Sequence, residues 1–105
     1  MLPTTARQAF DRLADAIERT VAARGFNEVC QYAEQLGLKG GKTNSITTLG
    51  YRFDGEDASG AKIELYVRSY DPSGPCQNIP DINRFTVTIT ENGVQTARYE
   101  NEYSD

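Results

Sequence analysis

The stretch AKIELYVRSY, residues 61–70, decides the fold of this 105-residue chain. Its residues alternate, with Ile63, Leu65 and Val67 at one parity and charged, polar or tyrosine residues at the other. Successive side chains of a β-strand point to opposite faces, so the stretch predicts a strand with one dry and one wet face. The other segments can then be assigned by whether they would cover the dry face.

Length and composition indicate one soluble domain over residues 1–105, large enough for a single modest core. Fifteen acidic residues against eleven basic ones give a net charge of −4. This balance argues against nucleic-acid binding, which usually relies on a basic stripe. The sequence has neither an apolar run of the ~20 residues that cross a bilayer nor an N-terminal secretory signal. We therefore expect a cytoplasmic protein, or else the processed form of a longer one, that binds neither nucleic acid nor membranes.

A first amphipathic helix is predicted over residues 4–24, where apolar residues recur every three or four positions and face one side. Thr4 or Thr5 is suited to cap its start, and Gly25 is suited to end it. The apolar stripe comprises Phe10, Leu13, Ile17 and Val21.

A second helix is predicted over residues 27–36, with Asn27 as its N-cap and Gly37 as a left-handed stop. Its apolar stripe comprises Val29, Ala33 and Leu36. Cys30, on the flank of this stripe, is interpreted as a small buried hydrophobe. Together with Cys76 it could form one disulfide, but nothing else indicates an oxidising compartment, so we expect free thiols.

The following segment, residues 37–43, reads GLKGGKT and resembles a phosphate-binding loop. Its glycine spacing is one residue too short, and it follows a helix instead of a strand. We interpret it as a flexible connection to a sheet of four strands, at residues 45–54, 61–70, 83–90 and 94–103.

The first two strands suggest a register in which Phe53 lies opposite Ile63 and Arg52 lies opposite Glu64, because this alignment pairs both apolar and charged residues. The acidic loop between them is interpreted as a solvated turn. In the last hairpin, the Asn92-Gly93 dipeptide favours a two-residue turn. That turn would bring Arg98 opposite Val87, so we predict a three-residue loop at residues 91–93 instead.

These elements predict a two-layer α+β domain, with both helices on one face of a four-stranded antiparallel meander. The loop over residues 71–82 contains three of the four prolines and is a candidate binding segment. The wet sheet face is either plainly solvated or a partner surface, since tyrosine and arginine are enriched at interface hot spots. The candidate partner-binding residues are Ile46, Tyr66, Arg68, Tyr70, Arg84, Arg98 and Ile79.

The chain has no histidine, which excludes Ser-His-Asp and Cys-His catalysis and histidine-based zinc sites. No pair of carboxylates can be assigned to acid–base work. We therefore predict no catalytic residues, no metal and no cofactor.

The function predicted from this composition is that of a small acidic protein-binding module. An inhibitor, an immunity protein or a phage anti-defence protein would suit it, acting by occupying a partner protein. The alternative is a small-ligand-binding or homodimeric domain, by fold-level analogy with cystatin-like and nuclear-transport-factor-like architectures. A third possibility is a structural or oligomeric subunit that associates through its strand edges, which its mass in solution would distinguish.

Overall fold

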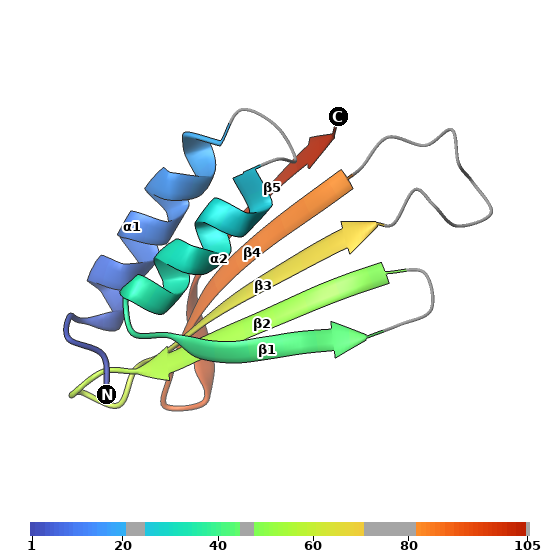
Figure 1. Cartoon of the computed structure of the whole chain (residues 1–105). Coiled ribbons are helices and arrows are strands. Elements are labelled where there is room, and N and C mark those ends of the chain that lie inside the picture. The colour runs from blue at the N-terminus through green and yellow to red at the C-terminus, as the bar shows by residue number, and fades with distance from the viewer. Residues whose placement is uncertain (21–24, 45–47, 71–81, 105) are drawn as a thin grey trace.

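The computed structural model describes residues 1–20, 25–44, 48–70 and 82–104. Within these residues, two helices precede five strands that neighbour one another in chain order, each pair antiparallel. Both helices lie on one side of the sheet (Figure 1). The predicted α+β class, with N-terminal helices over an antiparallel meander, is confirmed. The elements are α1 (Ala6–Glu18), α2 (Phe26–Gln35), β1 (Lys39–Asn44), β2 (Thr48–Glu56), β3 (Lys62–Tyr70), β4 (Ile82–Glu91) and β5 (Val94–Ser104).

The sheet has one strand more than predicted, because Lys39–Asn44 forms the edge strand β1 and not a flexible connection. Its sequence, KGGKTN, lacks the apolar alternation by which strands are recognised. Gly40 brings it very close to β2: a Cβ at this position would meet the carbonyl oxygen of Arg52 at 1.8 Å. A glycine is therefore required where the two backbones approach each other.

Helix α1 begins as predicted, with Thr5 as its N-cap and Gln8 completing a capping box. It ends at Glu18, earlier than the predicted residue 24. The N–H of Thr20 turns back to the carbonyl of Ile17, and its hydroxyl donates to the carbonyl of Ala16 at 3.2 Å. Such short-range bonds satisfy the last carbonyls and close the helix. The predicted apolar residue Val21 lies outside the described residues.

Helix α2 begins at Phe26, with Gly25 as its N-cap, so Gly25 starts this helix and does not end α1. The predicted cap, Asn27, lies inside the helix. The predicted stop is confirmed, since Gly37 has φ +95°. The predicted stripe is also confirmed: Val29, Ala33 and Leu36 are buried.

The predicted alternation is confirmed in β2, β3 and β4 and in β5 from Ala97 on, where odd-numbered residues face the helices. In β1 the parity is reversed, since Gly40 lies opposite Phe53. Leu65 and Val87 are fully buried, whereas Tyr66 and Thr86 are partly exposed on the opposite face. Each large apolar side chain buried in this way contributes about 1.5–3 kcal/mol before entropy is subtracted. The buried core comprises Leu2, Ala6, Ala9, Phe10, Leu13, Ile17, Val29, Ala33, Leu36, Leu38, Phe53, Ala61, Ile63, Leu65, Val67, Phe85, Val87 and Ile89.

The predicted register between β2 and β3 is wrong by two residues. Phe53 lies opposite Leu65, and Gly55 takes the place opposite Ile63. The cause is a tighter turn than predicted: β2 continues to Glu56, and Asp57 closes the connection through backbone bonds to Ala61 and Gly60. A shift of two residues leaves every side chain on its predicted face.

The predicted three-residue loop of the last hairpin is also wrong. Asn92 and Gly93 both have positive φ, 53° and 78°, and form a two-residue turn between β4 and β5. The conflict with the buried face is resolved by a bulge at Thr96, since Thr90 lies opposite Gln95 while Ile89 lies opposite Ala97. The extra residue restores the alternation, and Val87 lies opposite Tyr99.

Candidate functional site

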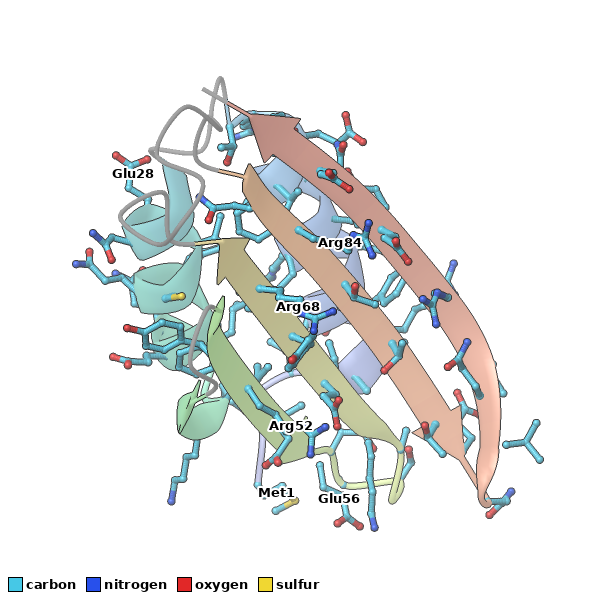
Figure 2. The ribbon with its side chains drawn as sticks, turned by 90° about the vertical axis from the view of Figure 1, so that its right-hand side faces the viewer. Met1, Glu28, Arg52, Glu56, Arg68 and Arg84 are labelled. Carbon is cyan, nitrogen blue, oxygen red and sulfur yellow. The ribbon has the colours of Figure 1, made fainter. Side chains whose placement is uncertain are left out.

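The sheet face turned away from the helices, here called the open face, carries three cross-strand rows of residues from β2 to β5. Figure 2 shows Arg52, Arg68 and Arg84 on this face, with the helices on the far side of the sheet. The rows are Gly50, Arg68, Arg84 and Glu102; Arg52, Tyr66, Thr86 and Glu100; and Asp54, Glu64, Thr88 and Arg98.

Arginine–glutamate pairs connect these rows at the β4–β5 side. Arg84 donates to Glu102 at 2.9 Å and approaches Glu100 at 3.7 Å. Arg98 donates to Glu100 at 2.7 Å, and this hydrogen bond is the main cause that lowers the pKa of Glu100. The side chains remain about half exposed, so each pair contributes little to stability but fixes the orientation of its arginine.

At the β2–β3 side, the guanidinium of Arg52 lies 5.9 Å from the ring centre of Tyr66 and 3.5 Å from Glu64. The register correction explains this arrangement. Arg52 lies directly opposite Tyr66 and reaches the predicted partner Glu64 diagonally. The tyrosine ring is therefore held against a cation in the middle of the open face.

Two arginines, Arg68 and Arg84, lie directly opposite each other near the end of β3 and the start of β4. The other cross-strand neighbour of Arg68 is Gly50, which has no side chain to cover it. The open face thus presents the exposed side chain of Arg68 beside Arg84, whose guanidinium is bound to Glu102.

These residues line a shallow hollow of about 380 Å³ that opens to solvent. It combines positive, negative, hydroxyl and aromatic groups on rigid strands, which suits hydrogen bonding to another surface more than enclosure of an apolar ligand. Its lining comprises Arg52, Glu64, Tyr66, Arg68, Arg84, Thr86, Thr88, Gln95, Arg98 and Glu100.

Of the residues predicted from sequence, the structure brings Tyr66, Arg68, Arg84 and Arg98 together on this surface. Ile46 and Ile79 lie outside the described residues, as does the loop 71–81. Tyr70 belongs to β3, but its side chain lies outside the described part of the chain. Sequence reasoning omitted Arg52, Glu64 and Glu100 from the candidate set, although their even numbering places them on the same face.

Asp57 was interpreted as part of a solvated turn, and this interpretation is wrong: the residue is only 8% exposed. Its carboxylate accepts from the N–H of Ala6 at 2.7 Å, from the hydroxyl of Ser59 at 2.6 Å, and from the N–H groups of Ser59 and Ala61. These hydrogen bonds, that from Ala6 first, lower its pKa to about 2. Asp57 therefore joins the β2–β3 turn to the start of α1.

A second structural cluster joins the end of α1 to β5. The hydroxyl of Tyr103 donates to the carbonyl of Ile17 at 2.6 Å, and that of Tyr99 donates to Glu18. Asn101 donates to both hydroxyls, at 3.1 and 3.2 Å. Burial, followed by the bond to Glu18, raises the pKa of Tyr99 to about 12. This cluster orients the helix layer on the sheet.

Cys30 is partly buried, and burial followed by the charge of Glu34 raises the pKa of its thiol to about 11. A thiol with a raised pKa is a poor nucleophile, in keeping with a packing role. Among the described residues, no group of three or more acidic or cysteine side chains is placed to hold a metal ion. No described helix is long and apolar enough to span a membrane.

Comparison of the chain with protein-family models, with curated proteins and with solved structures found no match.

Proposed function

We propose that this protein is a non-catalytic binding module that acts by covering part of another protein with its open face. The observation that supports this proposal most directly is the position of Arg68. Its exposed side chain lies beside Arg84, in the cross-strand row next to that of Tyr66. Arginine and tyrosine dominate binding energy at protein interfaces when a partner excludes water from them. Carboxylates of the partner could form charge-assisted hydrogen bonds with the exposed arginines of this face.

An inhibitor, an immunity protein or a phage anti-defence protein would work in this way. Such a protein needs a stable scaffold and one rigid surface, and it needs no chemistry of its own. The small-ligand alternative has less support, because the hollow is open and its lining is strongly charged. Pockets for small ligands are usually more enclosed and mostly apolar.

The proposal is tested by capturing partners from a lysate of the source cells on the immobilised full chain. We expect one protein to be retained by the wild type and lost with Tyr66→Ala or Arg68→Glu. Arg12→Glu is the matched control, because Arg12 is an exposed arginine of α1 on the helix layer. Retention by the control and loss by both open-face variants would support the proposal.

Removal of an interface arginine or tyrosine should weaken binding of the purified partner by about tenfold or more. Equal retention of the partner by all variants would place the interface elsewhere, and the absence of any specifically retained protein would contradict the proposed function.

A further inference from the structure

The outer edge of β5 is a second surface with a defined chemistry. The strand order leaves β4 as the neighbour on one side of β5, and no described strand pairs with the other side. In Figure 2, β5 borders the sheet, while α1 lies behind β4 and β5 and not beside them. An edge strand presents a row of backbone donors and acceptors that can pair with another strand.

The strand has eleven residues from Val94 to Ser104, and it is regular from Ala97 on, after the bulge at Thr96. Its midpoint is Tyr99. Arg98 and Glu100 flank this midpoint, with opposite charges and with both side chains on the open face. A second β5, placed antiparallel about a two-fold axis at Tyr99, would therefore bring each Arg98 opposite a Glu100 of the other copy.

We infer that two copies of this chain associate through antiparallel pairing of their β5 edges, in the register that places Tyr99 opposite Tyr99. This register pairs residues 97–101 of the two copies, on the regular side of the bulge at Thr96, and forms two cross-strand arginine–glutamate pairs, which are favourable when directly opposite. Because the contact is two-fold, the same patch serves both copies and the assembly closes as a dimer. Residues on the open faces of the two copies then form one continuous surface.

Neighbouring registers that keep the helices on one side are less favourable. Moving the two-fold axis by one residue in one direction brings Arg98 opposite Arg98, and moving it in the other direction brings Glu100 opposite Glu100. Charged residues on an edge strand often serve to prevent aggregation. Here Arg98 would repel its copy in one shifted register. In the other, Glu100 would repel its copy, while each Arg98 would face a Glu102 that is already bound to Arg84. Only the centred register brings no like charges opposite each other, so it is favoured.

Charge reversal tests the register directly. Sedimentation equilibrium of the full chain should give twice the 11.6 kDa of one copy. Arg98→Glu and Glu100→Arg should each raise the dimer dissociation constant by about tenfold or more, because each brings like charges together at both symmetric positions. An equimolar mixture of the two variants should recover the dimer, since both carboxylates of the first variant then face the two guanidinium groups of the second.

The double variant carrying both changes should also dimerise with itself, which keeps the test valid if one single variant folds poorly. Circular dichroism checks folding in each case. Arg52→Glu is the matched control, since it breaks an exposed arginine–glutamate pair on β2 without touching β5. It should leave the dimer dissociation constant unchanged.

A wild-type chain that stays monomeric up to millimolar concentration would overturn the inference. So would a dimer that tolerates both single reversals, or one that Arg52→Glu weakens equally. The readout is the mass of the protein alone, so this result is independent of whether a partner protein binds the open face.

Discussion

Asp57 shows what one side chain contributes to this fold. Its carboxylate accepts four hydrogen bonds, three within its own turn and one from Ala6 at the start of α1. Asp57→Asn replaces an acceptor of charge-assisted bonds by a neutral amide, and we expect a lower free energy of unfolding at pH 7.

The pH dependence of this difference identifies its cause. The pKa of Asp57 is lowered from 3.8 to about 2 in the folded state, so its stabilisation is present above pH 3.8 and is lost as the pH falls through 2. Urea unfolding of wild type and Asp57→Asn should therefore converge between these pH values. Asp54→Asn, at an exposed position of β2, is the control and should stay within about 0.5 kcal/mol of wild type at pH 7. A constant gap down to pH 2 would contradict the assignment.

Tyr99 makes the opposite prediction at alkaline pH. Tyr99→Phe removes its hydrogen bond to Glu18, and we expect a loss of about 0.5–1.5 kcal/mol at pH 7. The pKa of Tyr99 is raised from 10 to about 12, so wild-type stability is complete below pH 10 and falls as the pH rises towards 12. Thermal unfolding over this range should show a shallower decline for Tyr99→Phe. Tyr66→Phe, on the open face and distant from Glu18, is the control and should decline like wild type.

At the scale of the element, β1 depends on glycine at one of two adjacent positions. A Cβ on Gly40 would meet the β2 backbone at 1.8 Å, whereas a Cβ on Gly41 would have nothing within 4 Å. We expect Gly40→Ala to separate β1 from β2 and to cost about 1–3 kcal/mol, as other overpacked positions do. Gly41→Ala should be nearly neutral. Hydrogen exchange of the β1 amides distinguishes the two, and equal protection in both variants would contradict this account.

The bulge in β5 predicts an asymmetry between two deletions. Thr96 is the extra residue of the bulge, so its deletion leaves a regular hairpin with the same facing pairs. Deletion of Glu100 instead turns Asn101 and Tyr103 to the open face and breaks the cluster with α1. We expect the first deletion to change stability by less than about 1 kcal/mol and the second to cost at least about 2 kcal/mol. Thermal unfolding measures both, and a second deletion as mild as the first would contradict the register.

The same elements explain how far the sequence could predict the structure. Faces were predictable because the period-two pattern depends only on burial, and every register error was a shift of two residues that preserved it. The register between β2 and β3 depends on the turn that the carboxylate of Asp57 closes, and the register between β4 and β5 depends on the bulge at Thr96. Neither feature can be recognised from the alternation of apolar and polar residues. β1 was missed because its glycines serve a close backbone approach and not a buried face.

For the molecule as a whole, the division into a helix-covered and an open face explains why the residues of the candidate surface could be predicted better than their contacts. Parity alone placed Tyr66, Arg68, Arg84 and Arg98 on one face, together with Arg52, Glu64 and Glu100. It could not show that Arg52 lies against Tyr66 or that Arg68 faces Arg84, because these contacts depend on the exact register. The residues of the buried face can therefore be predicted from the alternation of apolar residues in the sequence. The contacts on the open face can be predicted only when the register of the strands is known.

This division predicts opposite effects for two nearly isosteric substitutions on adjacent residues of β4. Val87 is fully buried, while Thr88 is partly exposed on the open face. Val87→Thr places a hydroxyl among apolar side chains and should lower the free energy of unfolding by about 1–3 kcal/mol, the cost of burying an unsatisfied polar group. Thr88→Val should change it by less than about 0.5 kcal/mol. Urea unfolding of both variants, with backbone amide spectra to confirm an unchanged fold, measures the difference. Equal effects would mean that the two faces of the sheet are not distinguished by burial, and both the helix-covered core and the open binding face would have to be reassigned.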